Sequence, residues 1–171
     1  MTAEEMAARQ SVEVAADPKT AFKLWTEGIN EWWKRGSHYW NDGKRAVGLR
    51  FEPGVGGRFI EVYDAATGEG LEIGRIRVWD PGRRLVYGWR EAGWQDGEMT
   101  AVEVLFESTG PGLTRVTVTH SGWETIRDPE RSHRLRDGYA YGLNELLGWY
   151  REASGTNTMR PQPSSVSDRI L

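Results

Sequence analysis

Apolar positions recur at steps of three and four along residues 131–152, and this period predicts one long amphipathic α-helix. Asp128 and Pro129 precede it as the expected N-cap and first helical residue, because an Asp oxygen can accept from free backbone amides and Pro has none to donate. Gly155 is the expected C-cap. The predicted inner stripe of the helix consists of Leu135, Tyr139, Gly142, Leu143, Leu146 and Tyr150.

Between residues 47 and 120 the period changes to two, which is typical of β-strands. It predicts strands at residues 47–52, 58–63, 71–79, 85–89, 100–106 and 114–120, after a weaker first strand at residues 10–16. The phase of the alternation changes inside residues 71–79, and a β-bulge at Gly74 would account for the change. The last two strands are expected to form a hairpin across residues 109–112.

Two short helical segments are expected between the first strand and the others. Asp17 and Pro18 repeat the cap signal before the first of them, and residues 29–34 form a second short helix or a turn. A polar and aromatic loop follows at residues 35–44. The order predicts an α+β fold, a curved antiparallel sheet of six to seven strands wrapped around a long C-terminal helix. Such a sheet and helix tend to leave a pocket between them.

The length of 171 residues indicates a single domain, for which we expect residues 10–153. Residues 1–9 are then an N-terminal extension, and residues 154–171 a poorly packed tail. No apolar run approaches the ~20 residues that span a bilayer, and the N-terminus lacks the apolar region of a signal peptide, so a cytoplasmic protein is expected.

Composition excludes several kinds of site. The chain has no Cys, which excludes disulfides and thiolate metal sites. The net charge is −3 and the Arg residues are dispersed, so nucleic-acid binding is not expected. The three His residues lack metal-ligand spacing, and the glycines at residues 54–57 lack the Lys of a phosphate loop. We therefore expect neither a metal nor a cofactor.

The nine Trp residues give the chain an unusual aromatic content, and aromatic rings can bind flat or apolar ligands through a large contact area. Each ring could instead belong to the core, although Trp40 and Trp94 lie in polar loops where core packing is less expected. The predicted ligand-binding residues are Trp32, Trp33, Trp40, Phe51, Phe59, Trp89, Trp94, Val102, Val104, His120, Tyr139, Gly142 and Leu143.

Two glycines lie four residues apart inside the predicted long helix, where each costs about 1 kcal/mol relative to Ala. The missing side chains of Gly138 and Gly142 could leave room for a ligand beneath the helix. They could equally allow close packing against a large sheet residue such as Trp89. The sequence leaves both interpretations open.

His120 and Glu61 are the candidates for acid–base chemistry. His120 shares strand parity with Val116 and Val118, and Glu61 shares it with Phe59 and Tyr63, so both side chains could face the pocket. His120 could instead be a hydrogen-bonded structural residue. For Glu61 the alternative is an ion pair with an Arg on a neighbouring strand, such as Arg90.

Five segments, taken in order, resemble a known family. They are residues 22–33 (FKLWTEGINEWW), residues 53–59 (PGVGGRF), Gly74 followed by Pro81 and residues 83–89 (RRLVYGW), residues 113–123 (LTRVTVTHSGW) and residues 138–146 (GYAYGLNEL). The pattern is similar to that of the domain homologous to the activator of the 90-kDa heat-shock protein's ATPase, over about residues 11–152. Tyr139 stands where that family more often has Trp.

This resemblance implies the helix-grip fold of the START and birch-pollen-allergen (SRPBCC) superfamily, which encloses a hydrophobic cavity. It does not imply one activity, because the superfamily contains lipid carriers, hormone receptors, polyketide cyclases and co-chaperones. Three hypotheses follow. The chain could bind a hydrophobic or aromatic small molecule, bind a chaperone, or act as a cyclase- or dehydratase-like enzyme through His120 and Glu61. It is expected to be a monomer or a homodimer.

Overall fold

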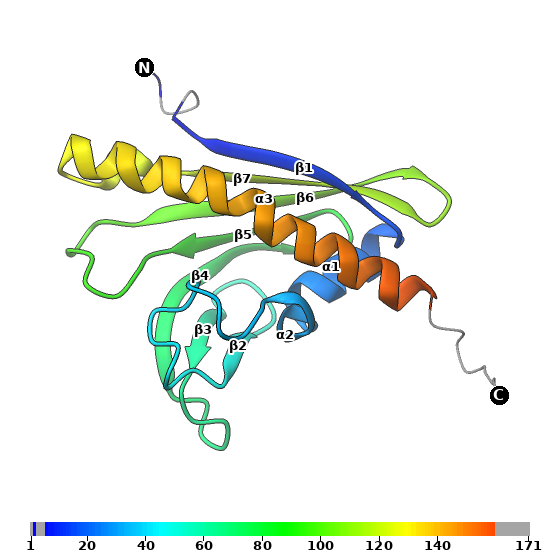
Figure 1. Cartoon of the computed structure of the whole chain (residues 1–171), viewed down its shortest axis with the longest axis horizontal. Coiled ribbons are helices and arrows are strands. Elements are labelled where there is room, and N and C mark those ends of the chain that lie inside the picture. Colours follow the sequence, from blue (N-terminus) through cyan, green and yellow to red (C-terminus); the bar gives the residue numbers. More distant parts are fainter. Residues whose placement is uncertain (1, 3–5, 160–171) are drawn as a thin grey trace.

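The structure is a computed structural model that describes residue 2 and residues 6–159 (Figure 1). The predicted α+β helix-grip architecture is confirmed. The helices are α1 (Pro18–Thr26), α2 (Ile29–Trp32) and α3 (Pro129–Met159), with a 3-10 turn, η1 (Trp123–Thr125), before α3. The strands are β1 (Ala8–Val14), β2 (Gly48–Phe51), β3 (Arg58–Val62), β4 (Gly70–Asp80), β5 (Arg84–Trp89), β6 (Thr100–Gly110) and β7 (Leu113–Ser121).

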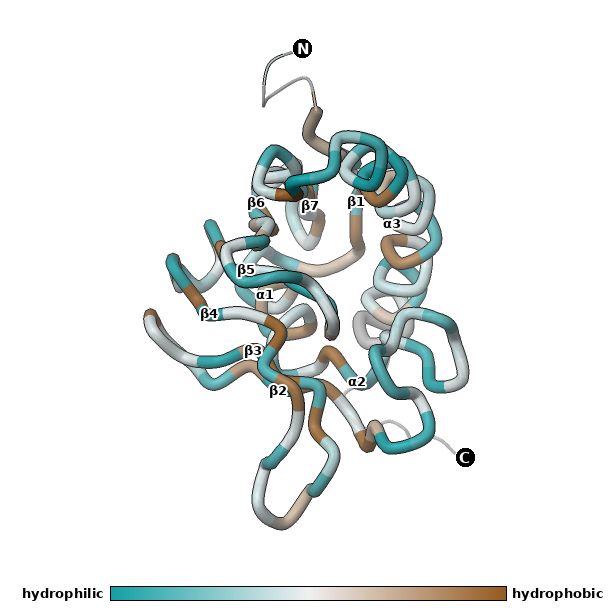
Figure 2. The backbone as a smooth tube through the Cα atoms, turned by 90° about the vertical axis from the view of Figure 1, so that its left-hand side faces the viewer, coloured by the Kyte–Doolittle hydropathy of each residue, from teal (hydrophilic) through white to brown (hydrophobic). Residues whose placement is uncertain are grey.

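The strands form one sheet in the order β1-β7-β6-β5-β4-β3-β2, and neighbouring strands are antiparallel. Viewed from the end of the molecule, the sheet follows an arc and α3 closes its open side (Figure 2). The expected hairpin of β6 and β7 is present, with Val102 opposite His120 and Val104 opposite Val118. Even-numbered residues of β6 and β7 therefore share the face that is covered by α3.

The irregularity expected near Gly74 is confirmed. The register between β3 and β4 shifts, because Phe59 lies opposite Gly74 while Ile60 lies opposite Glu72. A Cβ atom at position 74 would lie 1.8 Å from the carbonyl oxygen of Gly88 on β5. Only glycine permits this close approach of two strands, so position 74 requires a glycine.

The long helix begins as predicted but ends later. Asp128 accepts hydrogen bonds from the amides of Glu130 (3.1 Å, at the side chain) and Ser132 (2.9 Å, at the carbonyl). The predicted C-cap at Gly155 is wrong, because α3 continues to Met159 and Ser154 is fully buried. A glycine inside a helix costs only about 1 kcal/mol, which tertiary packing outweighs. Of the expected tail, residues 160–171 lie outside the described residues.

Two hydrophobic clusters occupy the space between the sheet and α3. In the larger one, Tyr150 of α3 packs edge-on against Trp25 and Trp32, at centroid distances of 5.0 and 5.2 Å. The smaller cluster contains Trp94, Trp123 and Ile126, near the start of α3. These two clusters leave the middle of α3 as the part that faces a cavity.

The start of α3 is also held by an ion pair. Arg131 donates to both carboxylate oxygens of Glu98, at 2.8 and 3.0 Å, and the amides of Gln95 and Arg127 donate to the same carboxylate. These hydrogen bonds lower the pKa of Glu98 to about 2, with the Arg131 side chain contributing most. The loop that carries Trp94 is thereby joined to α3.

Candidate functional site

A cavity of about 590 Å³ lies between α3, the middle strands of the sheet and the loop at residues 35–46; we call it the α3 cavity. Its interior is formed by buried residues and its mouth by exposed ones, including His38, Ala92 and Gly138. The buried lining residues are Trp25, Trp32, Trp33, Tyr87, Val102, Val118, His120, Gly142 and Leu143. The volume lies in the usual range for small-molecule sites.

Nine of the thirteen residues predicted to bind a ligand line this cavity. They are Trp32, Trp33, Trp40, Trp89, Val102, His120, Tyr139, Gly142 and Leu143. The other four do not line it. Phe51 and Phe59 are stacked on each other at 4.1 Å and pack beneath Tyr87, while Val104 is fully buried in the core. Trp94 belongs to the smaller cluster, because the loop that carries it folds back under the start of α3.

Glu61 supports the cavity wall without lining it. Its carboxylate, in a residue that is 1% exposed, accepts hydrogen bonds from the Asn41 amide (2.8 Å), the Asp42 amide (2.8 Å) and the Tyr63 hydroxyl (2.8 Å). The expected pairing with Arg90 is absent, since both oxygens already accept from these neutral donors. The proposed proton-transfer pair of Glu61 and His120 is therefore not formed. Glu61 instead fixes the loop beside the mouth.

The two helical glycines have different surroundings. A Cβ atom at Gly138 would meet nothing within 4 Å, which leaves open space at the cavity mouth. A Cβ atom at Gly142 would lie 3.0 Å from two atoms of the Tyr39 side chain. Gly138 therefore leaves room beneath the helix, which was one of the two interpretations of the sequence. Gly142 allows close packing, which was the other, although its partner is the loop residue Tyr39 and not Trp89.

His120 is a buried titratable group of the cavity wall. Its Nε2 lies 2.7 Å from the Thr100 hydroxyl, and its ring packs against those of Trp123 (4.5 Å) and Tyr139 (5.0 Å). Burial lowers the pKa of His120 to about 3, because the protonated ring loses its hydration. His120 is therefore a neutral imidazole at physiological pH.

Tyr139 connects the sheet to the mouth of the cavity. Its hydroxyl accepts a hydrogen bond from the Trp89 indole (2.8 Å) and donates one to the carboxylate of Glu91. Burial raises the pKa of Tyr139, and the negative charge of Glu91 raises it further. This hydroxyl uses its proton and one lone pair within the protein. Glu91, a lining residue that the sequence analysis missed, places a carboxylate beside the opening.

The loop at residues 35–46 also contacts α3 directly. The Tyr39 hydroxyl donates to Glu145 at 2.7 Å, and the Trp33 indole donates to the Tyr39 carbonyl at 3.2 Å. Burial and the hydrogen bond to Glu145 raise the pKa of Tyr39 to about 12. Arg134 lies exposed at the mouth, without an ion-pair partner among the described residues. The mouth thus carries charged groups, and the interior does not.

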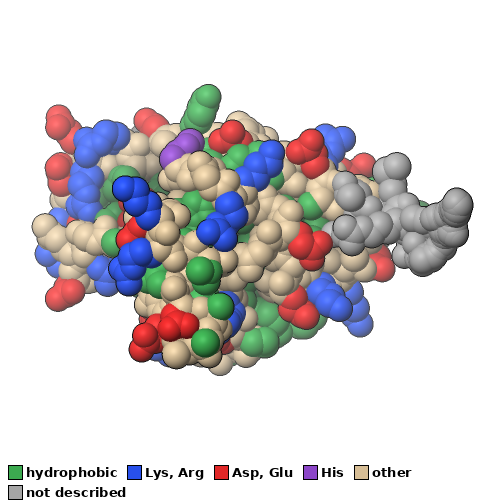
Figure 3. Space-filling model, turned by 60° about the horizontal axis from the view of Figure 1, so that its bottom comes forward, with side chains coloured by type: hydrophobic (Ala, Val, Ile, Leu, Met, Phe, Trp, Pro, Cys, Tyr) green, Lys and Arg blue, Asp and Glu red, His purple; other side chains and the backbone are tan. Residues whose placement is uncertain are grey.

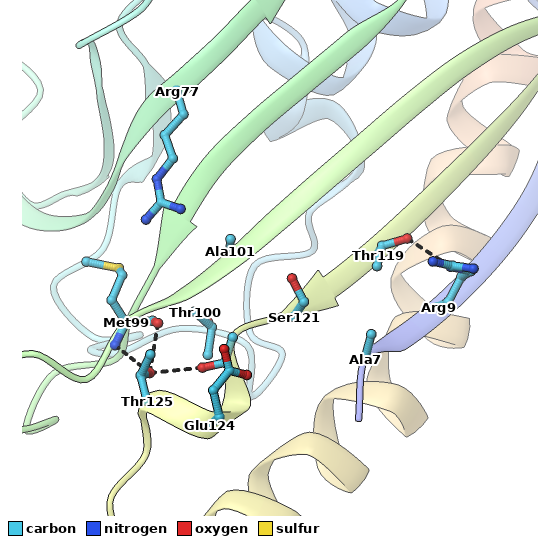
Figure 4. Close-up of a pocket in the computed structure, with 11 residues that line it drawn as sticks. Ala7, Arg9, Arg77, Met99, Thr100, Ala101, Thr119, Ser121, Glu124 and Thr125 are labelled. Atoms are coloured by element: carbon cyan, nitrogen blue, oxygen red, sulfur yellow. Dashed lines mark hydrogen bonds between the residues drawn. The ribbon is translucent and has the colours of Figure 1, made fainter. Parts of the chain in front are cut away.

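A second depression, of about 610 Å³, lies on the outer face of the sheet (Figure 4). Arg77, Ala101, Thr119 and Ser121 project into it from β4, β6 and β7, on the face opposite α3. Its hydroxyls are partly used, since Thr119 accepts from Arg9 at 3.1 Å. It has no aromatic wall among the residues that line it, so the α3 cavity is the better candidate for an apolar ligand.

Within the described part of the chain, no group of three or more His, Asp or Glu side chains is placed so that it could hold a metal ion. No helix in that part is long and apolar enough to cross a membrane.

Sequence reasoning missed several lining residues. Glu91 and Ala92 follow β5 in a loop, and Tyr39 and Asn41 lie in another, where no periodicity indicates the direction of a side chain. Tyr87 lies two residues before Trp89 on β5, and this period of two was the available signal that both side chains point to the cavity.

Comparisons with known proteins give the family and the fold. Residues 15–147 match the family described as activator of Hsp90 ATPase homolog 1-like protein. No curated protein sequence matches the chain.

Three solved structures illustrate the fold. An anthrahydroquino-gamma-pyrone synthase, Txn09, complexed with a molecule designated SUM, is 29% identical with a TM-score of 0.56, and the match covers 90% of this chain and 99% of Txn09.

The self-sacrificing resistance protein CalC from Micromonospora echinospora is 27% identical, with a TM-score of 0.57, over 90% of this chain and 97% of CalC. An HSP90 activator from Plasmodium falciparum is 18% identical, with a TM-score of 0.51, over 68% of this chain and 73% of that one, and shows the fold alone. The family match covers well over half of the chain and agrees with the fold. The chain therefore belongs to the activator of Hsp90 ATPase homolog 1-like family.

Proposed function

We propose that this protein binds a small hydrophobic or aromatic molecule in the α3 cavity. The observation that carries the proposal is the cavity itself, about 590 Å³ with buried aromatic and aliphatic walls and few polar groups. This combination is typical of sites that bury most of the surface of a small-molecule ligand. Indole rings such as Trp33 and Trp89 offer large contact areas at low conformational cost.

Two structural neighbours are compatible with a small-molecule role. Txn09 is described as a synthase that was complexed with another molecule, and CalC as a resistance protein. Both are more than 25% identical to this chain and are covered almost completely. Direct binding measurements on this chain identify its ligand.

The test is calorimetric titration with 6-methoxy-2-acetylnaphthalene, an uncharged two-ring probe. Wild type is expected to bind it, and Gly138→Phe is expected to weaken binding at least about tenfold by placing a ring at the open position of the mouth. Gly148→Phe is the matched control, because its Cβ atom also meets nothing within 4 Å but Gly148 does not line the cavity. Equal affinity of the two variants, or no binding to wild type, would contradict the proposal.

A second function, proton transfer on a bound aromatic substrate, is favoured by one observation. Glu91 and His120 line the same cavity, and Tyr139 contacts both, through its hydroxyl and its ring. A carboxylate and a neutral imidazole are suitable acid–base groups. This pair replaces the predicted pair of Glu61 and His120.

Its test is hydrogen exchange at carbon in the same probe. The protein in D₂O should accelerate replacement of the acetyl methyl protons by deuterium, followed by NMR, because a base that removes such a proton returns a deuteron from solvent. Glu91→Gln should lose the acceleration and keep the binding affinity. A rate no faster than that in buffer would leave binding as the only role of the cavity.

A chaperone partner is a weaker proposal. It rests on the family description and on a neighbour that shows the fold alone. Acidic and basic side chains are interspersed on the face shown in Figure 3, so charge does not mark a docking surface there. Co-purification with a 90-kDa chaperone, lost on substitution of surface residues, would support this role.

A further inference from the structure

We propose that the α3 cavity selects a planar aromatic molecule with a hydrogen-bond acceptor at one end and a hydrogen-bond donor at the other. Tyr87 donates to the acceptor, and Nδ1 of His120 accepts from the donor. This inference rests on the proposed function and adds the chemical class of the ligand.

The hydrogen bonds of Thr100 determine the tautomer of His120. The Thr100 hydroxyl lies 2.9 Å from the Trp89 carbonyl oxygen and 2.7 Å from Nε2 of His120. A carbonyl oxygen only accepts, so the single hydroxyl proton is donated to Trp89. Thr100 must then accept from His120, and Nε2 carries the proton.

Nδ1 of His120 is consequently an acceptor. It has no hydrogen-bond partner among the described residues, although the side chain is only 6% exposed and lines the cavity. A buried acceptor without a partner costs free energy unless a ligand or an ordered water satisfies it. The nearby Tyr139 hydroxyl cannot serve, because its proton is donated to Glu91.

Tyr87 supplies the complementary group. Its hydroxyl oxygen accepts a long hydrogen bond of 3.4 Å from the Trp25 indole, while its own proton has no acceptor within the described part of the chain. The side chain is 3% exposed and lines the same cavity. Its ring is held edge-on against Phe51 and Phe59, each at 5.1 Å. The cavity thus contains one buried donor and one buried acceptor that are both unused.

The strand register sets the separation of the two groups. Tyr87 lies opposite Val102 on β6, and Val102 lies opposite His120 on β7. The three residues therefore form one row across three strands, on the face that is covered by α3. Two strand spacings separate the backbones of Tyr87 and His120 by roughly 10 Å. A fused two- or three-ring system that lies over Val102 could reach both.

Both protein groups are neutral. Burial lowers the pKa of His120 to about 3 and raises that of Tyr87, so neither carries a charge near neutral pH. Charged groups such as Glu91 and Arg134 line the mouth instead. A neutral hydroxyl or N–H and a neutral carbonyl are accordingly the ligand groups that match the interior.

Three probes test this class of ligand by calorimetry. 6-Hydroxy-2-acetylnaphthalene carries both groups, 6-methoxy-2-acetylnaphthalene lacks the donor, and 6-ethyl-2-naphthol lacks the carbonyl. The first is expected to bind at least about tenfold more tightly than either of the others, because each of the others leaves one buried group unpaired.

Two variants assign the groups. Tyr87→Phe should abolish the preference for the acetyl group but keep the preference for the hydroxyl group. His120→Phe should do the reverse. If all three probes bind wild type equally, or if both variants keep its ranking, the inference is wrong while the binding function stands. If no probe binds, the binding function fails and this inference fails with it.

A measurement on wild type avoids dependence on how the variants fold. Two-bond ¹H–¹⁵N spectra report which ring nitrogen of a histidine is protonated. The inference predicts a proton on Nε2 of His120 and a shift of the Nδ1 signal when the hydroxyl probe is added. A proton on Nδ1, or an Nδ1 signal that does not respond to the probe, would overturn the role of His120.

Discussion

The two parts of the space beneath α3 differ in how their polar atoms are satisfied, although both are lined by aromatic rings. Beneath the C-terminal part, Tyr150 is fully buried and its hydroxyl donates to the Ala21 carbonyl at 2.6 Å. Beneath the middle of α3, Tyr87 and His120 each keep one hydrogen-bonding group without a partner among the described residues, and both line the α3 cavity. Aromatic content alone therefore does not distinguish a core from a binding site, whereas unused buried polar groups do.

The largest expected effect on stability is in the closed part of this space, the packed rings around Tyr150 beneath the C-terminal part of α3. Tyr150→Ala should lower the free energy of unfolding by about 3–5 kcal/mol, because it leaves a cavity beside Trp25 and Trp32 and removes a buried hydrogen bond. Guanidinium unfolding measures the change. Tyr141→Ala is the control, since Tyr141 is 81% exposed at the mouth and its loss should change stability by no more than about 0.5 kcal/mol. Equal losses of stability in both variants would contradict the claim that the rings around Tyr150 form a packed core.

In the open part of this space, the α3 cavity, Glu61 holds the loop that forms one wall. Glu61→Gln should lower stability by about 1–3 kcal/mol, because an amide group then faces the amides of Asn41 and Asp42. Hydrogen exchange of these two amides should become faster than that of the amides in β6. Glu69→Gln, at an exposed position, is the matched control. Unchanged exchange at Asn41 would mean that other contacts hold the loop.

His120, in the wall of the α3 cavity, should make the stability of the folded protein depend on pH. Its pKa is about 3 in the folded protein and 6.5 in the unfolded chain, so below pH 6.5 the unfolded state binds a proton that the folded state does not. Stability should therefore fall by about 1 kcal/mol per pH unit between pH 6 and 4.5. The groups that face His120 are Thr100, Trp89, Trp123 and Tyr139, the last of these bonded to Glu91.

Unfolding of wild type and His120→Asn across this pH range measures the effect, which the variant should lack. Glu52 and Glu98, with pKa values of about 2 and an ordinary value of 4.5, lose their stabilisation only at lower pH, as the pH falls from 4.5 toward 2. Parallel stability curves for the two proteins would contradict the assignment to His120.

The smallest expected effect is a difference in stability between Ala substitutions at Gly138 and Gly142 of α3. Gly138→Ala should raise stability by about 1 kcal/mol, because Ala favours the helix and its methyl group meets open space. Gly142→Ala should give no gain, since its methyl group would press on the Tyr39 ring. Thermal unfolding compares the two variants. An equal gain at both positions would show that the loop at residues 35–46 adapts freely.

The periodicity of the sequence predicts the fold well because it reports burial, which dominates the choice of strand and helix faces. It places His120, Val102 and Tyr139 on the inner face, where the structure has them. It does not give the partners of Glu61, which come from the loop at residues 35–46, and it gives no direction for Trp94, which itself lies in a loop. It also fails at Gly155, because helix ends depend on packing as well as on local propensity.

The most direct test of the account is an NMR titration of the wild-type protein with 6-hydroxy-2-acetylnaphthalene, followed on backbone amides and methyl groups. The account predicts saturable shifts centred on Val102, Val118, His120 and Leu143, which line the α3 cavity. Shifts confined to Arg77, Ala101 and Ser121, on the outer face of the sheet, would contradict it.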